Sequence, residues 1–199
     1  MNAALKPPSY EHKLELREVL EALAADALIK PAQARDLLVR LESGSGAAHQ
    51  HPLVTVAECN WENPQAPGRR LTLEVLVQWL AKRSGLAYLR IDPLSIDVSK
   101  VAAVIPYAYA ARTKILPVKV TAAEITVATC EPYLQDWERE LAPMLKQKKI
   151  VRVLANPQDI ERYLLEFYAL ARSVKASENE RNQAGPGNVQ NLEQLIELG

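Results

Sequence analysis

Hydrophobic residues recur at helical spacing near the start of the chain and predict two amphipathic helices. In the stretch from Glu11 to Ala25 the apolar positions follow an i, i+3, i+4, i+7 pattern, formed by Leu16, Val19, Leu20 and Leu23. A second stripe, Ala34, Leu37, Leu38 and Leu41, follows Pro31, a residue that suits the first position of a helix. We therefore expect an αα-hairpin over residues 1–42, too small to bury both of its apolar faces.

The next segment, residues 43–71, has the composition of a loop-rich connector. Glycine, histidine, asparagine and proline are frequent in it, and one apolar island, residues 53–57, is expected to pack against a core together with Trp61. Thr72 is a suitable N-cap for the following helix, and Gly85 is placed as the residue that ends it.

The stretch 86–132 predicts a strand, a helix and a β-hairpin. The strand is residues 86–91, the helix begins after Asp97 and is kinked by Pro106, and the hairpin pairs the β-rich runs 115–120 and 124–128. Apolar spacing further predicts a helix over 134–145, a strand over 150–154 and a helix that starts at Pro157. This order predicts an α+β fold in which helices pack on a small mixed β-sheet.

The pattern divides the chain into several parts. Residues 72–175 form the α+β domain, and residues 176–190, rich in polar residues with Gly and Pro, form a flexible linker. Residues 191–199 begin a new amphipathic pattern with Leu192, Leu195 and Ile196, which we interpret as the start of a further, truncated domain.

Composition narrows the possible classes of protein. Lys plus Arg number 24 and Asp plus Glu number 24 among 199 residues, so no net field attracts nucleic acid or an anionic membrane. No apolar run has the roughly 20 residues that a membrane span needs, and no signal-peptide pattern opens the chain. Cys59 and Cys130 are expected to be free thiols in a reducing compartment, with a disulfide as the lesser alternative.

The sequence offers no complete catalytic or metal-binding constellation. No glycine opens a G-x-x-x-x-G-K-[ST] phosphate loop, so these residues are not expected to hydrolyse ATP. His49, His51 and Cys59 do not make up a zinc ligand set, and we interpret the histidines as solvated. Cys130 lies in an apolar run without an activating histidine, so it is expected to be inert. We predict no catalytic residue, no metal site and no cofactor.

An ordered set of short phrases carries a resemblance to a known family. They are Gly85-Leu-Ala-Tyr-Leu-Arg-Ile-Asp-Pro93, Tyr107-Ala-Tyr-Ala-Ala-Arg112, Ile115-Leu-Pro-Val118, Val127-Ala-Thr-Cys-Glu-Pro132 and Ile150-Val-Arg-Val-Leu-Ala-Asn-Pro157. Over about Arg70 to Lys175 the chain resembles the N-terminal region of the type II secretion and type IV pilus assembly ATPases.

This resemblance implies a non-catalytic docking domain of a protein-export motor. Its expected partners are the cytoplasmic domain of an inner-membrane platform protein and the other ATPase domains of the same chain, which would carry ATP hydrolysis. The expected location is cytoplasmic and peripheral at the inner membrane. A third hypothesis is that the chain is an independent structural module of a pilus motor.

The resemblance also implies an alternative function, a cyclic di-GMP sensor. Some N-terminal domains of the family bind that dinucleotide through R-L-G-x-x-L motifs. Here Glu18-Val19-Leu20 and Arg70-Leu71-Thr72 occupy the corresponding places, so both motifs are degenerate. Arg69 and Arg70 are the candidates for contacting the dinucleotide, and a solvated surface is the simpler interpretation of the two arginines.

Tyrosine–arginine pairs are the candidates for a partner interface: Tyr107, Tyr109, Arg112, Tyr168 and Arg172. Tyr107 and Tyr109 lie two apart on a helix and cannot both be core, and Phe167 and Tyr168 are expected to diverge in the same way. Core packing with a polar tip remains the alternative use of these tyrosines.

Overall fold

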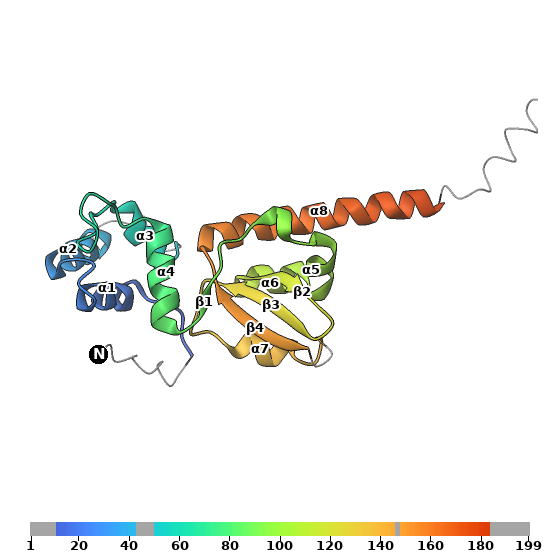
Figure 1. Ribbon diagram of the computed structural model, residues 1–199, viewed down its shortest axis with the longest axis horizontal. Coiled ribbons are helices and arrows are strands. Elements are labelled where there is room, and N and C mark those ends of the chain that lie inside the picture. The colour runs from blue at the N-terminus through green and yellow to red at the C-terminus, as the bar shows by residue number, and fades with distance from the viewer. Residues whose placement is uncertain (1–10, 43–49, 146–147, 184–199) are drawn as a thin grey trace, which may run out of the picture.

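The structure is a computed structural model that describes residues 11–42, 50–145 and 148–183. It contains two units (Figure 1), a helical unit formed by α1 to α4 and an α/β unit from which the last helix extends. Among the described residues, no helix combines the length and the apolar character needed to cross a membrane.

Four helices form the helical unit: α1 (Leu16–Ala25), α2 (Pro31–Glu42), α3 (Pro52–Glu58) and α4 (Leu73–Ser84). Their apolar faces share one cluster, whose most deeply buried members include Leu20, Leu23, Leu53, Leu76 and Leu80. The predicted hairpin of α1 and α2 is thus completed by α3 and α4, which supply the apolar surface that two helices lack.

The connector prediction for residues 43–71 missed a helix. The island 53–57 belongs to α3, where Leu53 and Val56 are buried and Trp61 is half-buried against the same cluster, as expected. Pro52 stands at the start of α3 and His51 caps it, so proline at N1 was the available signal. Residues 43–49 lie outside the described residues.

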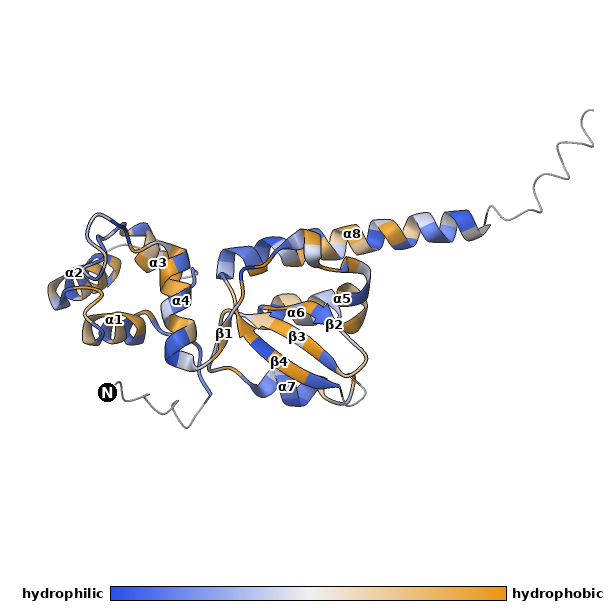
Figure 2. Ribbon diagram, viewed as in Figure 1, coloured by the Kyte–Doolittle hydropathy of each residue, from blue (hydrophilic) through white to orange (hydrophobic). Residues whose placement is uncertain are grey.

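The α/β unit contains a four-stranded mixed sheet in the order β1-β4-β3-β2. The strands are β1 (Ala87–Tyr88), β2 (Ile115–Val120), β3 (Glu124–Thr129) and β4 (Lys149–Leu154). The hairpin β2–β3 is antiparallel, and β4 is parallel to both β3 and β1. In Figure 2, orange hydrophobic segments are visible in β3 and β4, interrupted by polar positions. The α+β prediction is confirmed, although the first strand is shorter than the predicted 86–91.

Pro106 separates two helices where the sequence predicted one kinked helix. The chain forms α5 (Val98–Val104), takes an extended conformation at Ile105 and begins α6 (Tyr107–Thr113) after Pro106. Proline lacks the N–H that a continuous helix would need, and the residue before proline disfavours helical dihedrals, so the break replaces the kink. A short 3₁₀ turn, η1 (Pro93–Ser95), precedes α5, and α7 (Asp136–Leu141) connects β3 to β4.

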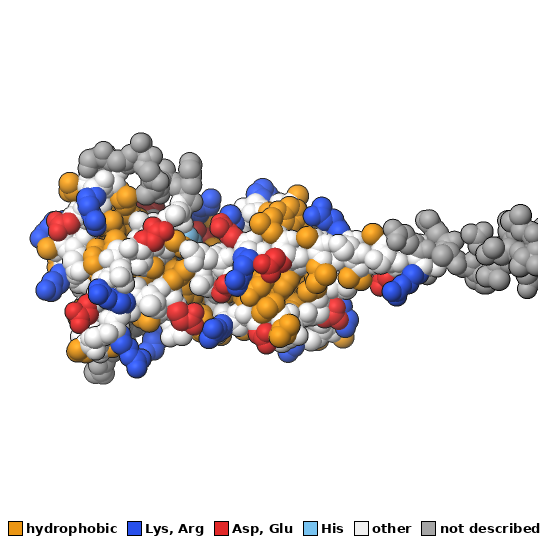
Figure 3. All heavy atoms as spheres, turned by 90° about the horizontal axis from the view of Figure 1, so that it is seen from above, with side chains coloured by type: hydrophobic (Ala, Val, Ile, Leu, Met, Phe, Trp, Pro, Cys, Tyr) orange, Lys and Arg blue, Asp and Glu red, His pale blue; other side chains and the backbone are white. Residues whose placement is uncertain are grey.

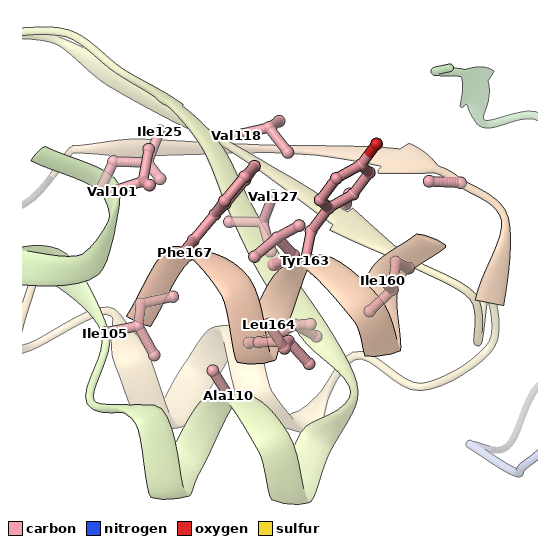
Figure 4. Packing of buried hydrophobic residues seen from close by; sticks show 14 of the residues in the cluster. Val101, Ile105, Ala110, Val118, Ile125, Val127, Ile160, Tyr163, Leu164 and Phe167 are labelled. Atoms are coloured by element: carbon pink, nitrogen blue, oxygen red, sulfur yellow. The ribbon is translucent and has the colours of Figure 1, made fainter. Parts of the chain in front are cut away.

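The last helix, α8 (Pro157–Gln183), packs its first half on the sheet and continues beyond it. Figure 4 shows its side chains Ile160, Tyr163, Leu164 and Phe167 packed among residues of the sheet, α5 and α6. The linker predicted for 176–190 is helical as far as Gln183, because its Ala, Glu, Arg and Gln residues are compatible with helix even without a core to pack on. Residues 184–199 lie outside the described residues.

Packing places the boundary between the units at the end of α4, not at Thr72. Gly85 ends α4 with φ 72°, a left-handed conformation that favours glycine, and turns the chain into β1. The segment before α1 lies against the α/β unit, where the Glu11 carboxylate accepts the Asp136 N–H at 2.9 Å. Leu154 of β4 in turn joins the hydrophobic cluster of the helical unit.

Candidate functional site: the α6 surface

α6 lies between α7 and α8 and runs antiparallel to α8. At its start Tyr107 contacts Tyr168 of α8, with ring centroids 5.4 Å apart. At its end Lys114 pairs with Glu161 of α8, with Nζ 2.6 Å from Oε1. Tyr168 follows Glu161 by seven residues, which is two helical turns, so these contacts fix the two helices side by side.

Leu165 lies on α8 between those two contacts. Glu161, Leu165, Tyr168 and Arg172 follow an i, i+4, i+7, i+11 pattern and therefore share the stripe of α8 nearest to α6. Leu165 is nevertheless 62% exposed and Tyr107 is 41% exposed. Two large apolar side chains from neighbouring helices thus remain available on one surface.

The other flank of α6 faces α7 through a polar cluster. The Tyr109 hydroxyl donates to Glu140 at 2.7 Å, and the Arg112 guanidinium lies 5.0 Å from the centroid of the Tyr109 ring. An Arg112 nitrogen is also 3.6 Å from Glu140 Oε2. Burial, followed by the hydrogen bond to Glu140, raises the pKa of Tyr109 to about 12. Tyr109 is therefore a neutral donor at physiological pH.

Tyr168 does not have the exposed position predicted for it. Its side chain is buried and its hydroxyl donates to the Ile105 carbonyl at 2.6 Å, while burial raises its pKa to about 12. Phe167 is buried as well, because α8 is covered by the sheet on one side and by α5 and α6 on the other. Both residues of this adjacent pair are core, against the prediction that they diverge. Arg172 is exposed and donates from Nε to the Tyr168 carbonyl.

We define the α6 surface by Tyr107, Tyr109, Arg112, Glu140, Leu165 and Arg172. It belongs to the unit that exposes most of the large apolar side chains. Within the described part of the chain seven are exposed, and six of these lie on the α/β unit: Leu94, Tyr107, Met144, Leu165, Leu170 and Val174. Figure 3 shows hydrophobic side chains gathered over this unit.

The dinucleotide candidates Arg69 and Arg70 are exposed on a turn of the helical unit. Arg70 donates to the Asn60 carbonyl at 2.7 Å and forms a β-bridge with Glu62, so part of its hydrogen-bonding capacity is used locally. Ala27 has φ 56°, a left-handed conformation that glycine adopts without strain.

The structure does not assemble the metal candidates, and one interpretation of them is wrong. His51 is a buried cap of α3 and not a solvated loop residue, and His49 lies outside the described residues. Cys59 and Cys130 are free thiols, and burial raises the pKa of both. In the described ranges no group of three or more His, Cys, Asp or Glu side chains is placed to hold a metal ion.

The fold defines the class of the second unit, an α+β domain in which helices pack on a small mixed four-stranded sheet. Residues 84–174 match the family model of the MshEN domain, and they coincide with the α/β unit. This segment of the chain thus resembles the MshEN domain, the N-terminal domain of type II secretion and type IV pilus ATPases. The predicted resemblance is confirmed.

The chain is also similar to individual proteins. The chain is 31% identical over 195 residues to the type IV pilus assembly ATPase TfpB of Acinetobacter baylyi, covering 96% of this chain and 32% of the relative. It therefore spans about a third of the length of that relative. A solved structure of MshE with cdg is 14% identical, covers 78% of this chain and 100% of its own, and has a TM-score of 0.53. The N-terminal domain of XpsE is also similar, at 15% identity over 79% of this chain and 99% of its own, with a TM-score of 0.45.

Proposed function

We propose that this chain is a docking module of a secretion or pilus motor. In this proposal the α6 surface attaches the motor to the cytoplasmic domain of an inner-membrane platform protein, which places the motor at the cytoplasmic side of that membrane. ATP hydrolysis would belong to other domains of the full-length protein. The supporting observation is the exposure of Tyr107 on α6 and of Leu165 on α8, where Leu165 lies one helical turn before the Tyr168 that Tyr107 contacts.

The chemistry of the α6 surface suits a protein partner. Tyrosine and arginine are enriched at protein interfaces, and an apolar centre with a polar rim is their usual arrangement. Tyr107 and Leu165 supply the apolar centre, while Arg112, Glu140 and Arg172 supply charged groups around it. Glu140 already holds Arg112 and Tyr109 in place, so these side chains are partly ordered before binding, which lowers the entropic cost.

Isothermal titration calorimetry with the purified cytoplasmic domain of the candidate platform protein tests this proposal. We expect Tyr107→Ala and Leu165→Ala together to weaken binding at least tenfold, about 1.4 kcal/mol, since each removes exposed apolar contact area. Val39→Ala is the matched control, because Val39 is 63% exposed on the other unit. Absence of binding by the wild type contradicts the docking role. Unchanged binding by the double variant assigns docking to another surface.

A second proposal is a cyclic di-GMP sensor in the helical unit. It is favoured by the fold similarity to MshE, whose structure was solved with cdg. It is opposed by Glu18 at the first arginine position. Isothermal titration calorimetry with cyclic di-GMP tests the sensor proposal. Binding with a Kd of about 1 μM that is lost in Arg70→Ala supports the proposal. The absence of any heat of binding by the wild type contradicts it.

A further inference from the structure

A cavity of about 490 Å³ lies where the two units meet. The helical unit and the segment before it contribute one wall, and the α/β unit contributes the other. The lining residues that matter here are Lys13, Leu14 and His51 on the first side and Glu131, Leu134 and Trp137 on the second. Clefts of this size between structural units commonly hold small ligands or inserted side chains.

Glu131 places a carboxylate in this cavity. Its side chain is only 13% exposed, and one oxygen, Oε2, accepts the Leu14 N–H at 2.9 Å. No described residue donates a hydrogen bond to the other oxygen, Oε1, whose nearest cationic candidate is His51 Nε2 at 4.0 Å. A carboxylate accepts several hydrogen bonds, so Glu131 retains unused capacity toward the cavity.

His51 does not neutralise Glu131. Its Nε2 lies 3.1 Å from the Cys130 carbonyl, to which it can only donate, and its Nδ1 accepts the Leu53 N–H at 3.3 Å. These two bonds require the neutral imidazole, and burial also lowers the pKa of His51. Protonation would force Nδ1 to give up the cap of α3.

The other carboxylates of the cavity have cationic partners. Glu161 pairs with Lys114, Glu140 with Arg112, and Asp136 with Arg139. Among the carboxylates that line the cavity within the described residues, Glu131 differs because no lysine or arginine nitrogen lies within 4.0 Å of it. Lys13 lines the same cavity but lies beyond that distance. Burial of this charge is costly and raises the pKa of Glu131.

We propose that this cavity binds an alkyl cation, a guanidinium or ammonium group on a short apolar stem. The cationic head donates to Glu131 Oε1, and the stem lies against Leu134 and Trp137. Such a group has two sources, a basic side chain of another polypeptide or a free small-molecule cation. Because the lining comes from both units, an occupant holds the helical unit against the α/β unit. The proposal does not depend on the docking role of the α6 surface.

The test is an NMR titration of the chain with n-propylguanidinium, followed through the Glu131 and Leu14 amides and the Trp137 indole N–H. We expect saturable shifts at these groups by about 10 mM ligand, as for a Kd of ~1 mM, and NOEs from the propyl chain to Trp137. The uncharged analogue n-propylurea has nearly the same shape and should produce no saturable shift. The affinity of acetyl-Ala-Arg-Ala-amide, compared with that of n-propylguanidinium, identifies the source of the cation. Tenfold tighter binding of the peptide indicates a polypeptide, and equal or weaker binding indicates a free small-molecule cation.

Glu131→Gln should weaken n-propylguanidinium at least tenfold, because the amide oxygen still accepts the Leu14 N–H but carries no charge. Asp136→Asn is the matched control, since its carboxylate is engaged by Arg139, and should bind within about twofold of the wild type. Equal affinity for the urea analogue, unchanged affinity in Glu131→Gln, or no saturable shift in the wild type overturns the proposal. If Glu131→Gln does not fold, the NOEs between the propyl chain and Trp137 in the wild type test the proposal: their presence supports it and their absence contradicts it.

Discussion

Tyr168 gives the sharpest test of the packing described above, because its hydroxyl makes one buried hydrogen bond. Tyr168→Phe keeps the ring in the core and removes only the group that donates to the Ile105 carbonyl at 2.6 Å. Ile105 is the extended residue between α5 and α6, where the helical hydrogen-bond ladder is interrupted. Its carbonyl would then be buried without this partner, which typically costs about 1–2 kcal/mol.

Urea denaturation followed by circular dichroism measures the loss in the free energy of unfolding directly. In a thermal melt of a chain of this length, a loss of 1–2 kcal/mol corresponds to a melting temperature lower by about 3–6 °C. Tyr107→Phe is the matched control, since Tyr107 is 41% exposed, and it should change the free energy of unfolding by less than about 0.5 kcal/mol. Equal effects of the two substitutions, or no effect of Tyr168→Phe, would refute the assignment of Tyr168 to the core.

Three further predictions follow from burial and backbone geometry. In the folded state the pKa of Tyr109 and of Tyr168 is about 12, above the ordinary value near 10. The stability that the two neutral hydroxyls contribute is therefore present below pH ~10 and is lost as the pH rises toward 12. Phenolate absorbance followed against pH should show one fewer tyrosine titrating near pH 12 in Tyr168→Phe than in the wild type. Gly85→Ala should cost about 1 kcal/mol in urea denaturation through its left-handed φ alone, because no atom beyond the adjoining residues and helix backbone lies within 4 Å of the added Cβ, and a cost above ~3 kcal/mol would contradict this. Leu154→Ala should cost about 3 kcal/mol in the same assay, whereas the exposed Leu165→Ala should cost under ~0.5 kcal/mol, and similar costs would contradict the burial.

Local signals were sufficient for most of the secondary structure. The predicted cap Thr72 accepts the Val75 N–H. Two helices also begin where the sequence predicted, after Asp97, which accepts the Lys100 N–H, and at Pro157, where Asn156 accepts the Gln158 N–H. The β2–β3 hairpin and β4 also lie where the β-rich runs predicted them. Each of these features depends on residues within a few positions of one another, so the sequence pattern carries it directly.

The site could be predicted only in part. The sequence paired Tyr109 with Arg112, and their side chains do contact each other, because they lie within one turn of α6. It misplaced Tyr168, because helical spacing shows which residues share a stripe but not how many elements cover the helix. It also missed Leu165, whose exposure beside α6 follows from the packing of two helices that are separate in the sequence.

The sequence by itself determined the periodic elements, the cap at Thr72 and the family that residues 84–174 match, since short-range patterns and ordered phrases encode all three. The tertiary structure alone decided that α4 packs with the helical unit, that His51 is buried against Cys130, and that Glu131 faces a cavity between the units. These facts join residues far apart in the chain, 79 positions for His51 and Cys130 and 117 for Leu14 and Glu131. Contacts of that range are fixed by the packing of whole elements, which no local periodicity encodes.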